Sequence, residues 1–169
     1  MTGARRQQKA KLRGLVLAAA IAGLAAAAPG GRLPADAATT GRIVTDSLTG
    51  LALSGFDPVA YFTERRPQLG EGVHELIHRG AVWRFRNDGN RAAFARDPDV
   101  YVPRFGGFDP VALTRGVAVP GHPLIWLISG DRLFLFSKPE NRSRFAADVE
   151  RSVAAAEHRW GEIEPTLVP

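Results

Sequence analysis

Two short neighbouring segments, residues 73–78 and 81–86, mix apolar residues with polar ones. The two residues between them are Arg79 and Gly80, and two short extended runs separated by such a pair are typical of a β-hairpin. A turn at this place predicts four cross-strand pairs: His78 with Ala81, Leu76 with Trp83, Glu75 with Arg84, and His74 with Phe85. One of these pairs joins opposite charges, which favours the register.

Residues with helical spacing follow this first hairpin. Asn87 is expected to cap a helix over residues 88–96, and Phe94 is its predicted buried anchor. Asp97 and Pro98 should end the helix, because the residue before proline disfavours helical backbone.

The second half of the chain repeats this order. Residues 124–129 and 132–136 predict a second hairpin. Residues 137–140, Ser-Lys-Pro-Glu, have the pattern of a capping box, and a longer helix is predicted after them. Its apolar stripe consists of Phe145, Val149, Val153, Ala156 and Trp160.

Two sequence words also recur in the same order. GFDPVA occurs at residues 55–60 and 107–112, an offset of 52, and NRxxFAxD occurs at residues 90–97 and 141–148, an offset of 51. Two words that repeat at nearly one offset indicate an internal duplication.

The first word contains an Asp-Pro pair in both copies, Asp57-Pro58 and Asp109-Pro110. Aspartate followed by proline is typical of a helix N-cap with proline at the first helical position, so short helices are predicted there. The fold class is therefore α+β: two pseudo-repeated units, residues 55–106 and 107–161, each of capped turn, β-hairpin and helix. Together they should form a small antiparallel sheet packed on helices.

The first 37 residues have the pattern of a signal peptide: a basic start, an apolar run over residues 14–28, and small residues at 35–37 for cleavage. The expected location is periplasmic or secreted. Whether the leader is cleaved or stays as an anchor, and whether Arg5 and Arg6 mark twin-arginine or general export, both stay open. Residues 38–54 are expected to be a linker and residues 162–169 a fraying tail.

The net charge of +5 belongs to the leader. Residues 1–37 hold six of the 22 Lys and Arg residues and one of the 17 Asp and Glu residues, which leaves 16 of each kind. A near-neutral domain gives no argument for binding nucleic acid, and membrane contact is expected only through an uncleaved leader. The chain has no cysteine, hence no disulfide and no thiolate metal site.

The segment His74-Glu75-Leu76-Ile77-His78 matches H-E-x-x-H, the zinc motif of metallopeptidases. That chemistry needs a helix, because residues four apart on a strand are about 13 Å apart, whereas both histidines must come within about 2.1 Å of one ion. Gly72 and Gly80 bracket only seven residues, and residues 82–85 follow at strand spacing, which favours a strand. No metal and no cofactor is therefore expected, although a zinc-dependent hydrolase stays open as an alternative.

Several segments resemble the small exported YHS-domain proteins of bacteria: GFDPVAYF, AVWRF, NRAAFARDPDVYVPRFGG, VPGHP and DRLFLF. The resemblance covers most of residues 45–160 and implies a compact α+β domain that occurs alone or attached to metal-handling proteins. Many members have a cysteine after the DPxxY turn, and this chain has Asp109 in that place. The substitution removes the thiolate, which argues against binding of copper or another soft metal.

Four residues are candidates for a binding site: Asp57, Tyr61, Trp83 and Asp109. The two aspartates occupy equivalent positions of the repeat and are explained equally by helix capping, while the two aromatic residues are explained equally by burial in the core. No catalytic constellation is complete. The predicted function is a non-enzymatic, exported domain that binds a small molecule or an envelope protein, and a purely structural interaction module is a further alternative.

Overall fold

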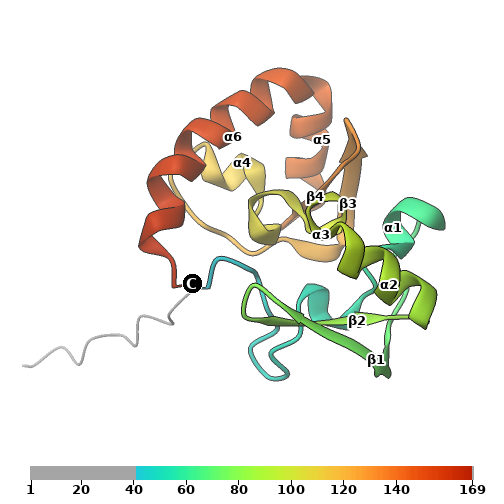
Figure 1. The fold of residues 1–169 in the computed structure, drawn as a ribbon. Helices are drawn as coiled ribbons and strands as arrows, with labels where there is room; N and C mark the ends of the chain where they lie inside the picture. The colour runs from blue at the N-terminus through green and yellow to red at the C-terminus, as the bar shows by residue number, and fades with distance from the viewer. Residues whose placement is uncertain (1–40, 169) are drawn as a thin grey trace, which may run out of the picture. The chain divides into compact units, whose positions relative to one another are not determined.

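The structure is a computed structural model that describes residues 41–168, so the predicted signal peptide and residues 38–40 of the predicted linker lie outside the described residues. The elements in chain order are η1 (Leu53–Gly55), α1 (Ala60–Thr63), β1 (Glu71–His78), β2 (Ala81–Phe85), α2 (Asp88–Arg96), α3 (Pro98–Tyr101), η2 (Arg104–Gly107), α4 (Pro110–Leu113), β3 (His122–Ser129), β4 (Arg132–Phe136), α5 (Pro139–Ala147), α6 (Val149–Ile163) and η3 (Glu164–Thr166) (Figure 1).

The α+β class is confirmed, with one correction. The strands form two separate antiparallel sheets, β1–β2 and β3–β4, instead of one joined sheet. The predicted register is confirmed for three of the four pairs of the first hairpin. The fourth is wrong because the register shifts between Glu71 and Glu75, so that Phe85 pairs with Glu71 and not with His74.

The duplication extends to backbone geometry. Leu53, Ser54 and Gly55 have φ of 53°, 50° and 83°, and the three residues that begin at Phe105 repeat the pattern with 56°, 62° and 92°. The register shift of β1 also recurs in β3, between His122 and Trp126. Left-handed backbone is unfavourable for non-glycine residues, so tertiary contacts impose the same conformation on both copies.

Two buried aspartates fix this geometry, and the first is Asp57, which is 0% exposed. Its Oδ1 accepts the backbone N–H of Val59 at 2.8 Å, but the helix predicted from Pro58 begins at Ala60, with Val59 as its N-cap. Its Oδ2 accepts the backbone N–H of Arg86 at 2.9 Å and the side-chain N–H of Asn90 at 2.6 Å. One carboxylate therefore ties the start of α1 to the end of β2 and to α2.

Asp109 makes the same contacts in the second half and is also 0% exposed. Its Oδ1 accepts the backbone N–H of Val111 at 2.8 Å, and its Oδ2 accepts both the N–H and the hydroxyl of Ser137 and the amide of Asn141. The Asn141 bond is 2.6 Å long, as in the first half. The two repeated sequence words thus touch each other through an Asp–Asn bond in each copy.

Two predictions about the second helical segment are corrected. The predicted capping box at residues 137–140 does not form, because the Ser137 hydroxyl donates to Asp109 instead. The N-cap residue of the helix is Lys138, which makes no side-chain cap bond. The long helix is interrupted at Asp148, where φ is −155°, and becomes α5 and α6.

The ends of the domain also differ from expectation. The segment predicted as a linker contributes four buried side chains to the core: Ile43, Leu51, Ala52 and Leu53. The segment predicted as a fraying tail folds back, since the backbone N–H of Arg42 donates to the carbonyl of Val168 at 2.9 Å. The folded unit therefore includes residues 41–54 and 162–168. Among the described residues, no helix is long and apolar enough to cross a membrane.

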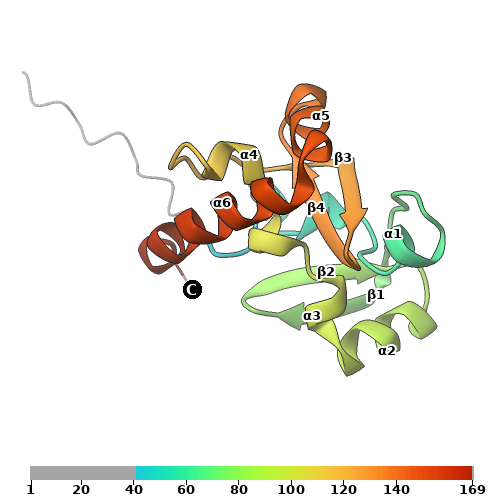
Figure 2. The same cartoon turned by 90° about the horizontal axis from the view of Figure 1, so that it is seen from above.

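The core consists of two apolar clusters that share strand β4. Leu133 and Leu135 belong to the cluster around Trp83 and Phe94, whereas Phe134 and Phe136 belong to the cluster around Phe145. Alternating residues of a strand point to opposite faces, so β4 lies between the two clusters. Figure 2 shows the β3–β4 hairpin between helices α5 and α6 on one side and the β1–β2 hairpin on the other.

Replacement of the second anchor by its isosteric amide, Asp109→Asn, is expected to lower the free energy of unfolding by about 2–4 kcal/mol. The amide nitrogen has no lone pair to offer, and it would face donors on every side. Urea denaturation measures the change. Asp131→Asn is the matched control, because Asp131 is an exposed turn residue at φ 56° and asparagine accepts that backbone. A loss of less than about 0.5 kcal/mol for Asp109→Asn would contradict the anchor role.

Candidate functional site

The four residues predicted to bind a ligand lie in the interior: Asp57, Tyr61 and Asp109 are 0% exposed and Trp83 is 1% exposed. The Tyr61 hydroxyl donates to the carbonyl of Pro123 at 2.9 Å, across the two halves, and the Trp83 indole N–H donates to the carbonyl of His78 at 3.1 Å. Burial, and after it the Asp57 carboxylate, raise the pKa of Tyr61, which keeps the hydroxyl protonated as a donor. Their binding role stays a prediction that this burial does not support.

The segment from His74 to His78 lies on β1, as predicted. The ring of His74 contacts the carboxylate of Asp88 at 3.2 Å, and the ring of His78 packs edge-on against Phe94 with centroids 5.6 Å apart. Within residues 41–168, no three His, Cys, Asp or Glu side chains are placed to hold a metal ion. The helix that a H-E-x-x-H zinc site requires is thus replaced by extended backbone.

His78 is nevertheless unusual among the described side chains. Its Nε2 is inaccessible to solvent and has no hydrogen-bond partner among them. Desolvation, and after it the positive charge of Arg79, lower the pKa of His78, while the Asp99 carboxylate opposes the shift. The neutral imidazole is therefore the form that the fold accommodates.

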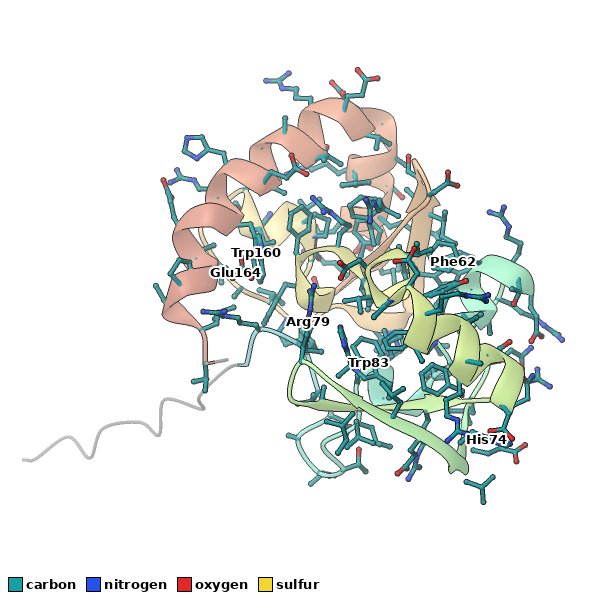
Figure 3. The ribbon with its side chains drawn as sticks, in the orientation of Figure 1. Phe62, His74, Arg79, Trp83, Trp160 and Glu164 are labelled. Atoms are coloured by element: carbon teal, nitrogen blue, oxygen red, sulfur yellow. The ribbon has the colours of Figure 1, made fainter. Side chains whose placement is uncertain are left out.

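A pocket of about 900 Å³ opens beside the turn of the first hairpin. Its walls come from the β1–β2 turn, α3, η2, the start of β4, the end of α6 and the first described residues. The residues that line it are Arg42, Ile43, Arg79, Gly80, Asp99, Val102, Pro103, Arg104, Phe105, Gly106, Arg132, Trp160 and Glu164. In Figure 3, Arg79 lies across from Trp160 and Glu164, which come from the C-terminal part of the chain.

Asp99 positions two of the arginines. Its carboxylate accepts from Arg79 at 2.7 Å, and its backbone carbonyl accepts from Arg132 at 3.0 Å. Two guanidinium groups from different halves of the repeat are thereby held beside one residue of α3.

The other two arginines are placed by different contacts. Arg104 pairs with Glu157 of α6 and lies over the ring of Phe105, 5.4 Å from its centroid. Arg42 is held through its backbone N–H, which donates to the carbonyl of Val168 at 2.9 Å, and Val44 two residues further on donates to the carbonyl of Gly106 at 2.8 Å. Glycine is required at position 106, since a Cβ there would come within 1.8 Å of the Arg42 carbonyl.

Reasoning from the sequence missed this pocket. Its arginines come from turns, element ends and the first described segment, so no periodic spacing connects them. A single local signal existed at Arg79, which occupies the first position of a hairpin turn with φ 51°. Asparagine and glycine are the residues that this turn favours, and arginine is not.

A second, smaller hollow of about 690 Å³ lies at the equivalent place of the second repeat, between the β3–β4 turn and α6. There Gly130 takes the position of Arg79, and Glu150 takes that of Asp99. Two residues line both hollows, Arg104 and Arg132. The repeat therefore produces two similar hollows, and the first has two additional guanidinium groups, those of Arg42 and Arg79.

Comparison of the chain with protein-family models, with curated proteins and with solved structures finds no match.

The depressed pKa of His78 predicts how stability depends on pH. The unfolded chain protonates His78 near its ordinary pKa of about 6.5, and the folded chain does so only at lower pH. The contribution of neutral His78 is therefore fully present above about pH 6.5 and decreases as the pH falls toward the folded pKa. Urea unfolding of His78→Asn should show a smaller loss of stability than the wild type between about pH 7.5 and about pH 5.5.

The matched control is His158→Asn. The His158 side chain is 74% exposed on α6, so its replacement should leave the pH-dependent loss unchanged. Equal losses in His78→Asn and in the wild type would contradict the assignment to His78.

Proposed function

We propose that this chain is a non-enzymatic module of the cell envelope that binds a small molecule in the pocket beside the first hairpin turn. The observation that carries the proposal is the pocket itself. Its volume of about 900 Å³ falls within the range of about 300–1,000 Å³ in which small-molecule sites are found. Its walls combine an aromatic surface, Trp160, with several polar groups that converge from separate segments.

The pocket also lies where ligand sites often form, at the contact of two structural units. Arg79 and Asp99 come from the first repeat, whereas Arg132 and Trp160 come from the second. A ligand in this place would contact both units and would stabilise their association, because any molecule that binds only the folded state raises its stability.

The resemblance to YHS-domain proteins supports a binding role in the envelope, and the signal-peptide pattern of residues 1–37 supports export. A zinc-dependent hydrolase is the less favoured alternative, because β1 holds His74 and His78 on extended backbone. Metal analysis of the purified protein and a peptidase assay of Glu75→Ala test that alternative. One bound zinc ion per chain, together with activity that the substitution abolishes, would establish it in place of the binding function.

An envelope protein as the partner has a different observation in its favour. Val73 and Ile77 are 78% and 76% exposed and share one face of β1, and Leu69 just before the strand is 64% exposed. The double variant Val73→Ser with Ile77→Ser separates the two functions, because it changes this face and leaves the pocket intact.

Binding is tested by a thermal-shift screen of small envelope metabolites against the purified protein. A ligand present at about 100 times its dissociation constant should add about 2.7 kcal/mol to the stability. Hits are then located by amide chemical-shift changes in NMR spectra. The amides of Gly80 and Gly106, in the pocket, should shift, whereas that of Gly116, outside the pocket, should not. Hits that all leave Gly80 and Gly106 unchanged would contradict a ligand site in this pocket.

A further inference from the structure

The pocket has an excess of positive charge. Four arginines line it, against two acidic residues, Asp99 and Glu164. The residues of the whole domain carry nearly equal numbers of both signs, so this excess is a local feature of the pocket wall.

The arginines keep most of their hydrogen-bonding capacity. A guanidinium group has five N–H donors. In the described part of the chain, Arg132 uses one of them, on the backbone carbonyl of Asp99, and Arg132 and Arg42 form no ion pair with a carboxylate there. Arg79 does pair with Asp99, but the two side chains are 54% and 70% exposed, and such exposed pairs contribute only about 0–1 kcal/mol. Donors from three arginines therefore remain available to a ligand.

The repeat shows that the fold does not require these charges. The position equivalent to Arg79 is Gly130, and the position equivalent to Arg132 is Ala81. Gly130 adopts φ 55° in the same turn in which Arg79 adopts φ 51°. Arginine at this position thus accepts a backbone conformation that costs an L-residue stability and that glycine adopts freely.

A second arginine, outside the pocket, has the same left-handed backbone conformation. Arg65 has φ 55°, is exposed, and is equivalent to Gly116 of the second repeat, at φ 76°. Backbone conformation alone therefore does not distinguish Arg79. What distinguishes it is its place in the pocket wall beside Arg132 and Asp99, and this difference makes Arg65 a matched control.

Trp160 supplies an apolar surface on the same wall. Its ring packs against Phe105 and Phe108, with centroids 5.9 Å and 5.8 Å apart, and it is half-buried. These contacts hold the indole in place, so that a flat apolar group can lie on it without ordering a mobile side chain.

We infer that the ligand is a small organic anion, with its carboxylate or phosphate group held by Arg42, Arg79 and Arg132 and its apolar body lying on Trp160. This inference rests on the proposed binding function and adds the chemical class of the ligand. Guanidinium groups bind carboxylates and phosphates through paired, charge-assisted hydrogen bonds. The anion would add a partner to arginines from both repeats without displacing a buried group.

The probes are phenyl phosphate, benzoate, inorganic phosphate and benzyl alcohol, each titrated into the full-length protein and followed by NMR. The two aromatic anions are expected to bind best, inorganic phosphate more weakly, and the neutral alcohol least. Added salt should weaken the binding of the anions, because the arginines are open to solvent and their charges are screened. Comparison of the affinities for phenyl phosphate and benzoate shows which anionic group the site prefers.

Arg79→Asn is the decisive variant. Asparagine suits the left-handed turn position, so the urea midpoint should stay unchanged or rise, while the dissociation constant for the better aromatic anion should rise about tenfold through loss of charge-assisted bonds. Arg65→Asn removes the same charge from the same backbone conformation outside the pocket and should leave the dissociation constant unchanged.

The outcomes separate this inference from the function on which it rests. If Arg79→Asn and Arg65→Asn weaken binding of the aromatic anion equally, the overall charge of the protein explains the effect, and the inference is overturned. Neutral molecules that shift Gly80 and Gly106, with no anion doing so, would overturn the anionic class and leave the proposed function standing. Absence of any binding from both the anion series and the metabolite screen would overturn both.

Discussion

One buried carboxylate in each repeat holds the fold together. Asp57 and Asp109 have no solvent contact, so every oxygen lone pair has to be satisfied inside the protein. Backbone N–H groups of the short helix satisfy one oxygen, and the strand end together with an asparagine satisfies the other. One side chain thereby fixes the start of the short helix to the strand end and the helix after it, which lie 28 to 33 residues further along the chain. An error in any of these elements would leave a buried charge without partners.

This constraint explains why two sequence words recur. The aspartate of GFDPVA and the first asparagine of NRxxFAxD form the same 2.6 Å bond in both halves. The phenylalanine of the second word, Phe94 or Phe145, then anchors its helix in the apolar cluster of its own half. The words are therefore the two sides of one contact, and the segment that the contact closes contains the hairpin of that half.

The sequence was informative wherever a local rule decides the structure. The turn at Arg79 and Gly80 set the register near the turn, and Asp109-Pro110 and Asn87 marked helix starts, because these features depend on neighbouring residues only. The predictions that were wrong concern positions at which tertiary contacts decide the structure. Ser137 has the pattern of a capping residue, but a buried carboxylate competes for its hydroxyl and wins. The shift beyond Glu75 likewise depends on how the strand fits the rest of the domain.

The candidate site could not be predicted for a related reason. Repetition made the duplicated positions conspicuous, and the two of them that were chosen as binding candidates, Asp57 and Asp109, are buried anchors without free surface. The pocket is built from positions at which the two copies differ, such as Arg79 against Gly130 and Arg132 against Ala81. Where a duplicated fold keeps the same residue twice, folding is a sufficient explanation for it. The residues at which the copies diverge are free of that shared requirement, and here they place arginines from both halves around a single pocket.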